Sequence, residues 1–201
     1  MPRRRYIFDP PDRFIAGTVG DPGNRSFFLQ AREGGRVVSV ALEKVQVAVL
    51  AERLGDLLGQ LDRRGVPHGS SESERVLEEA LGRVDAGGLL GEDPATLDEP
   101  LVEAFRAGSL TLGWDAEAQR VLVEARAQDE DGEAIDPDDD DDEDEDGPDL
   151  LRVRLTAAAA RSFVARAARV VASGRPPCPL CGAPLDPQGH ICPRRNGHYV
   201  N

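Results

Sequence analysis

The chain is poor in several residue types and patterns that mark whole classes of protein. It has three cysteines, one methionine and one tryptophan among 201 residues, and an odd number of cysteines is not typical of a disulfide scaffold. No stretch approaches the ~20 consecutive apolar residues that span a bilayer. Arg3, Arg4 and Arg5 precede no apolar segment, so we do not expect a signal peptide. These absences exclude membrane, collagen-like and disulfide-stapled proteins.

The negative charge of the chain is concentrated in one segment. The formal net charge is −13, from 24 basic and 37 acidic residues. Residues 129–149 hold 15 of the acidic residues and no basic one, so the rest carries 22 acidic and 24 basic residues, or +2. Nine consecutive acidic residues at 138–146 repel one another and have no apolar side chain to bury. We therefore expect residues 129–149 to be a disordered insertion.

Two parts of the chain show the same order of predicted elements. Strands are predicted where apolar residues alternate between turn signals, at 14–19, 26–32 and 37–42 in the first part and at 109–114, 120–125 and 150–155 in the second. A helix is predicted after each set, from about 43 to 64 and after Thr156, a suitable N-cap. A capping box at Ser71 and Glu74 predicts a further helix to about residue 84.

Short sequence matches strengthen this parallel. The aligned segments are 29–32 with 123–126, 40–42 with 153–155, 14–18 with 105–109 and 8–11 with 97–100. We therefore predict an α+β fold of two pseudo-repeated β-β-β-α units, related by a pseudo-twofold axis, with an antiparallel sheet and helices on one face. Chance similarity of short strands is the alternative. In this alignment the acidic insertion takes the place of the turn Gly34-Gly35.

All three cysteines and two of the three histidines lie in the last 24 residues. Cys178-Pro179-Leu180-Cys181-Gly182 is typical of a zinc knuckle, in which backbone N–H groups point at the thiolates. Cys192 supplies a third thiolate, and His190 would complete a tetrahedral Cys3His set for Zn2+. Because so few apolar residues surround this set, the metal would provide the free energy of folding. We predict a structural zinc knuckle at 175–201, after a duplicated domain at 1–174.

The fourth ligand and the role of the thiols have alternatives. His198 is the other candidate ligand, and three protein ligands plus water would be a catalytic geometry. Pro177 to Cys181 matches the Pro-Cys-x-x-Cys half of zinc deaminases, but no histidine is followed by their x-Glu, so the general acid/base is missing. A redox Cys-x-x-Cys should open a helix after a strand, whereas here prolines lead into a loop. Unliganded thiols are the remaining alternative.

No other motif marks an active site. The chain has no P-loop, no G-x-G-x-x-G and no G-x-S-x-G. Three arginines of the last predicted helix are expected on its solvated face: Arg161, Arg166 and Arg169. We therefore predict a non-enzymatic binding or adaptor protein with a protein partner. A nucleic-acid-binding zinc-ribbon protein, with Arg194-Arg195 near the knuckle, is the alternative, although +2 is far below its expected basic footprint. The third class is an enzyme whose site is assembled from scattered residues.

Several motifs resemble those of a known family. They are Phe8-Asp9, Leu42-Glu43-Lys44, Leu112-Gly113-Trp114-Asp115 and the tail from Cys178 to Gly197. Together they resemble an actinobacterial family of domains of unknown function, number three thousand and ninety, over nearly the whole chain. The resemblance implies a cytoplasmic protein encoded beside histidine-phosphatase-like and kinase-like proteins, and it implies no catalytic residues. The family usually has an aromatic residue at the position of His198, which favours His190 as the ligand.

Overall fold

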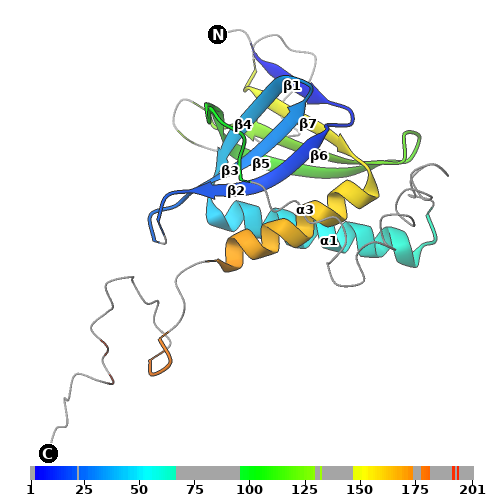
Figure 1. Cartoon of the computed structure of the whole chain (residues 1–201). Coiled ribbons are helices and arrows are strands. Elements are labelled where there is room, and N and C mark those ends of the chain that lie inside the picture. The colour runs from blue at the N-terminus through cyan, green and yellow to red at the C-terminus, as the bar shows by residue number, and fades with distance from the viewer. Residues whose placement is uncertain are drawn as a thin grey trace, which may run out of the picture.

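Seven strands and two helices make up the described part of the chain, which in the computed structural model is residues 3–21, 23–66, 96–129, 132, 147–173, 178–181, 192 and 194. The elements are β1 (Arg5–Phe8), β2 (Arg13–Val19), β3 (Ser26–Glu33), β4 (Arg36–Leu42), α1 (Lys44–Arg63), β5 (Glu103–Asp115), β6 (Arg120–Ala127), β7 (Leu150–Leu155) and α3 (Ala157–Ala172). The strands form one sheet in the order β1-β7-β6-β5-β4-β3-β2, and both helices lie on one side of it (Figure 1). The predicted α+β class is confirmed.

The first three predicted strands form an antiparallel meander at the expected places. β3 pairs along its length with β2 on one side and with β4 on the other. Alternation of apolar residues gives this meander a face on which Ala16, Leu29 and Val40 are fully buried. The turn between β3 and β4 contains Gly34 at a φ of +57°, a conformation that glycine adopts without a steric penalty.

The second meander, β5-β6-β7, differs from the prediction at its start. β5 begins at Glu103 rather than at Ser109, because its first residues pair with β4, where Phe105 lies opposite Val40. That pairing is parallel, as is the pairing of β7 with β1, a strand that was not predicted. The predicted antiparallel sheet is therefore wrong in two pairings and the sheet is mixed. The chain leaves β4 through α1 before reaching β5, and a crossover of this kind allows parallel strands.

The acidic insertion connects β6 to β7, the place held by Gly34-Gly35 between β3 and β4, as the alignment predicts. Most of its residues lie outside the described part, as do those of the predicted helix at 71–84. The prediction that the insertion is disordered therefore stays a prediction.

Both described helices begin at caps and bury one apolar stripe against the sheet. The side-chain oxygen of Thr156 accepts a hydrogen bond from the backbone N–H of Ala159 at 3.1 Å, so the predicted N-cap is confirmed. At the start of α1, Gln46 accepts from the backbone N–H of Glu43 at 2.8 Å. The buried helical residues include Val47, Leu50 and Leu54 in α1, and Ala160, Phe163 and Ala167 in α3. They join one core with the sheet.

The two meanders pair in corresponding registers. Leu29 lies opposite Val40 in the β3–β4 pair, and Val123 lies opposite Val153 in the β6–β7 pair. These are the residues that the sequence alignment matches. A residue in one meander can therefore be compared with its counterpart in the other.

The outer strands correspond differently from the sequence alignment. Phe14 lies opposite Ala31, and Leu110 lies opposite Ala125, the counterpart of Ala31. The pairing therefore makes Leu110 the counterpart of Phe14, whereas the sequence matches Phe14 with Phe105. The similar sequence segments 14–18 and 105–109 therefore do not occupy corresponding places in the sheet.

Arg166 of α3 is not simply part of a solvated face. Its Nε donates a hydrogen bond to the carbonyl oxygen of Ala16 at 2.8 Å, and β2 is an edge strand of the sheet. An arginine on an edge carbonyl hinders pairing with another strand. Arg161, by contrast, is exposed as expected and pairs with Asp62 of α1 at 3.0 Å.

Candidate functional site

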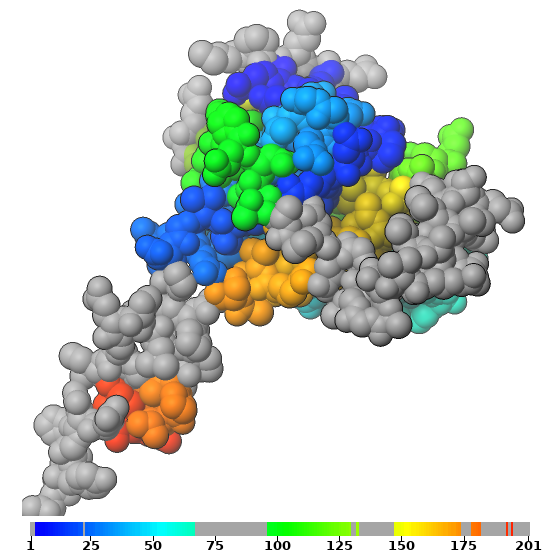
Figure 2. Space-filling view, in the orientation of Figure 1, coloured from blue at the N-terminus to red at the C-terminus, as the bar shows by residue number. Residues whose placement is uncertain are grey.

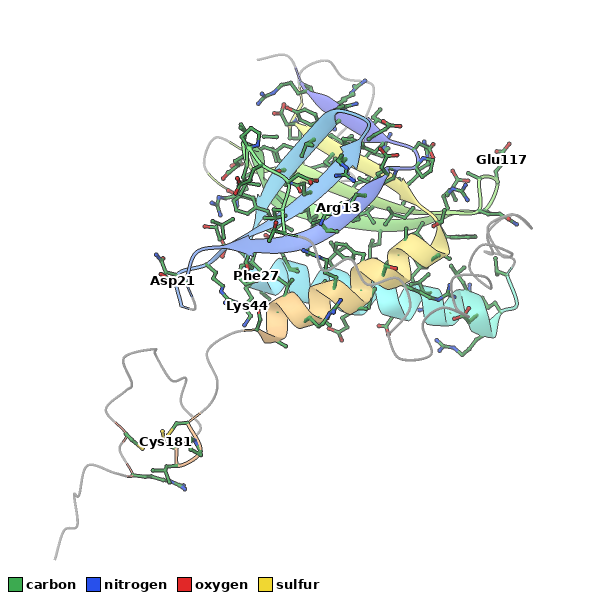
Figure 3. All side chains as sticks on the ribbon, in the orientation of Figure 1. Arg13, Asp21, Phe27, Lys44, Glu117 and Cys181 are labelled. Carbon is green, nitrogen blue, oxygen red and sulfur yellow. The ribbon has the colours of Figure 1, made fainter. Side chains whose placement is uncertain are left out.

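Three thiols come together beyond the C-terminal end of α3. Cys178, Cys181 and Cys192 place their sulfur atoms within 4.8 Å of one another, and all three cysteines are free. Cys178 and Cys192 are each only 6% exposed, and their sulfur atoms are 3.9 Å apart. Figure 3 labels Cys181, and Figure 2 shows the orange atoms of residues 178–181 beside the red atoms of residues 192 and 194. A separation of 3.9 Å is far longer than a disulfide bond of about 2.05 Å.

The turn that carries the first two cysteines favours the thiolate form of Cys178. The backbone N–H of Leu180 donates to the Sγ atom of Cys178 at 3.4 Å. The backbone N–H of Cys181, and then that of Leu180, lower the pKa of the Cys178 thiol because both stabilise the negative sulfur. The thiolate is the form that binds metal ions.

The sulfur geometry fits a tetrahedral metal ion. With Zn–S bonds of about 2.3 Å, two sulfur ligands of a tetrahedral zinc are about 3.8 Å apart. The observed separation of 3.9 Å between Cys178 and Cys192 is close to this value, and the third sulfur is within 4.8 Å. Thiolates suit zinc and other soft metal ions. The donor set is therefore compatible with a metal site and leaves room for a fourth ligand.

The structure brings together three of the four predicted ligands. Cys178, Cys181 and Cys192 meet although 10 residues separate the second from the third in sequence. His190 and His198 lie outside the described residues, so the choice between them stays a prediction. In the described part of the chain, these cysteines form the one group of three metal donors that converges closely enough to share an ion.

A buried amide that belongs to no recognisable sequence motif holds a connecting segment against β3. Gln30 is only 1% exposed. Its Nε2 donates to the hydroxyl of Ser39 and to the carbonyl oxygen of Asp98, each at 3.0 Å, and its Oε1 accepts from the N–H of Asp98 at 2.7 Å. The carboxylate of Asp98 pairs with Arg13 at 3.1 Å and with Arg32 at 3.3 Å. These bonds make a structural clamp.

A buried ion-pair cluster lies in the second meander, at the place that corresponds to Gln30 in the first. Glu124, the counterpart of Gln30, is only 5% exposed and Arg126 is 4% exposed. One oxygen of Glu124 accepts from the Nη1 of Arg126 at 2.9 Å, and the other accepts from the Nε of Arg152. The cluster joins β6 to β7. Strand alternation alone would place Glu124 on a solvated face, so the sequence gives no signal of its burial.

The fold and the cysteines define an α+β protein with three converging thiols in its tail that are compatible with a metal site. The chain matches the family described as protein of unknown function, DUF3090, over residues 6–192, and it belongs to that family. The match covers the sheet except for the first residue of β1, and it includes both described helices and all three cysteines. No curated protein and no solved structure matches the chain. Within the described residues, no helix combines the length and the apolar character needed to cross a membrane.

Proposed function

We propose that the protein is a non-enzymatic binding or adaptor protein with a structural zinc site in its C-terminal tail. The ligands are Cys178, Cys181, Cys192 and His190. The approach of the three sulfur atoms is the observation that supports the metal. Three thiolates at this spacing repel one another, and a bound dication removes that repulsion.

The role of the ion in this proposal is to fold residues 175–201. Four ligands from one short segment tie the segment into a closed loop, and a fully protein-ligated ion is typical of structural rather than catalytic zinc. Reduced thiols persist in a reducing compartment, which supports a cytoplasmic location.

The domain at 1–174 is the part that binds the partner in this proposal, and the buried polar groups of its sheet are engaged in structural bonds. Gln30 and Ser39 bond to each other, and Glu124 bonds to Arg126 and Arg152. These groups hold strands and segments together. The corresponding registers of the two meanders support a duplicated β-β-β-α unit as the origin of this domain. A protein partner that docks on its surface is part of the proposal.

Metal analysis of the purified protein tests the site directly. The full chain, purified from cells without added metal or chelator, should contain stoichiometric zinc by mass spectrometry of the elements. A strong chelator should remove the zinc and release resonances of residues 178–192 toward random-coil shifts in an NMR spectrum, while the spectrum of the sheet stays unchanged. Zinc far below the protein concentration, in samples with reduced thiols, would contradict the proposed site.

Two histidine variants identify the fourth ligand. His190→Ala should lower zinc affinity by at least tenfold because it removes one of the four bonds, whereas His198→Ala should leave the affinity unchanged. Competition with a chromogenic chelator measures both affinities. His198→Ala is the matched control, since it makes the same substitution in the same tail. The opposite ranking would assign the ligand to His198.

A further inference from the structure

A groove lies between the first helix and the fifth strand, away from the cysteines. Its volume is about 280 Å³. It is lined mainly by apolar residues: Val45, Val49 and Leu50 of α1, and Gly108, Leu110 and Leu112 of β5. Val45 and Val49 are 65% and 46% exposed, which is unusual for valines beside a core. The groove is therefore an apolar surface open to a ligand.

The corresponding place in the other half of the domain is filled. The counterparts of Leu110 and Leu50 are Phe14 and Phe163, since Leu50 is the seventh residue of α1 and Phe163 is the seventh of α3. The rings of Phe14 and Phe163 stack with their centroids 4.9 Å apart. In one half of the domain, two aromatic rings fill the space between helix and strand. In the other half, two leucines leave the corresponding space open.

The groove also contains a positively charged side chain, Arg53, at a position that corresponds to Arg166 in the other half of the domain. Arg53 lines the groove and is the tenth residue of α1, as Arg166 is the tenth of α3. Arg166 donates to the carbonyl oxygen of Ala16, whose counterpart is Leu112. In the described part of the chain no hydrogen bond or ion pair occupies the guanidinium of Arg53, which is exposed.

The other polar side chain of the groove is already engaged. The Nε2 of Gln46 donates to the carbonyl oxygens of Ala107 at 3.2 Å and Gly108 at 3.3 Å. Its Oε1 accepts from the backbone N–H of Glu43. Among the side chains that line this groove, Arg53 is therefore the one available to bind a negatively charged group of a ligand.

We propose that this groove binds a small carboxylate that carries an aromatic ring. The ring lies between Val49, Leu50 and Leu110, where the other half of the domain holds its stacked phenylalanines. The carboxylate pairs with Arg53, whose guanidinium is suited to two parallel hydrogen bonds with a carboxylate. A volume of about 280 Å³ is at the small end of ligand sites, so the ligand is about the size of phenylpropionate. This site goes beyond the zinc site and the adaptor role.

Titration with 3-phenylpropionate tests the proposal on the full, metal-loaded chain. Backbone NMR shifts of Val45, Val49, Gly108 and Leu110 should move together and saturate, with a dissociation constant of about a millimolar or tighter. Propionate, which lacks the ring, and 3-phenylpropylamine, which reverses the charge, should each bind at least tenfold more weakly. Failure of 3-phenylpropionate to saturate these shifts, or equal binding of the amine, would overturn the proposal.

Two variants locate the ligand. Leu110→Phe should fill the groove as Phe14 does in the other half and should abolish saturable binding, while the spectrum of the sheet shows that it folds. Arg53→Gln should weaken binding by about tenfold through loss of the charged hydrogen bonds. Arg169→Gln, on the exposed side of α3, is the matched control and should bind like the native chain. Undiminished binding by Leu110→Phe would place the ligand elsewhere and overturn the assignment.

Discussion

Replacement of Phe163 by alanine is expected to lower the free energy of unfolding by about 3 to 5 kcal/mol. Phe163 is 1% exposed and stacks on Phe14, so the change removes a large apolar side chain and leaves a cavity between α3 and β2. The neighbouring small residues, Ala160 and Ala167, offer no side chain long enough to fill that cavity. Urea denaturation, followed by far-ultraviolet circular dichroism, measures the loss.

The counterpart substitution is the control for this prediction. Leu50→Ala should cost about 2 to 3 kcal/mol, at the low end for a buried leucine, because Leu50 already borders the open groove and loses fewer contacts. The contrast between Phe163 and Leu50 would therefore measure how differently the two halves are packed. Equal losses for the two variants would contradict the packing difference on which that contrast depends.

Local sequence pattern was sufficient for most of the elements. The apolar residues in 26–32 and 120–125 place β3 and β6 within two residues of their observed ends. Both strands are buried on both faces over part of their length, since β3 buries five consecutive residues and β6 buries four. Thr156 was predictable because a threonine before an apolar helical stripe is a common cap. Both signals involve interactions over a few residues, so a single sequence contains them.

Pairing between distant strands was not predictable in the same way. β1 is a short strand, and its four residues become a strand only because β7 lies beside them. The first residues of β5 carry no clear alternation, yet they extend along β4. The sequence alignment of Phe14 with Phe105 was wrong for the same reason. Hydrogen bonds to neighbouring strands, rather than local sequence similarity, determine which residues occupy corresponding places in the sheet.

The candidate sites show the same division. Cys178 and Cys181 were predictable because their spacing forms one turn, and Cys192 because no other thiol could complete the set. The groove at Leu110 and Arg53 was not predictable, because its shape depends on how α1 lies beside β5 and on the phenylalanines that fill its counterpart. A local motif carries its own geometry, whereas a groove between elements is a property of the tertiary packing.

Replacement of Glu124 by alanine should lower the free energy of unfolding by about 3 kcal/mol or more. The carboxylate of Glu124 is shared by Arg126 and Arg152, and both Glu124 and Arg126 are almost completely buried. The change removes the acceptor from two charge-assisted hydrogen bonds and takes from the buried guanidinium of Arg126 the carboxylate with which it pairs. Urea denaturation gives the loss, and the Asp62→Ala variant, which breaks the exposed pair with Arg161, is the control at about 0 to 1 kcal/mol.

A double substitution separates the cost of leaving a buried charge without its partner from the net contribution of the ion pair to stability. Glu124→Leu combined with Arg126→Leu removes both buried charges and keeps apolar volume between β6 and β7, so it should recover most of the stability that Glu124→Ala loses. Arg152 is less deeply buried, with 21% of its side chain exposed, and water can replace its lost partner. Recovery would show that the ion pair contributes little net stability compared with apolar packing at the same place. If the double variant is as unstable as Glu124→Ala, the carboxylate itself must contribute net stability by linking β6 to β7.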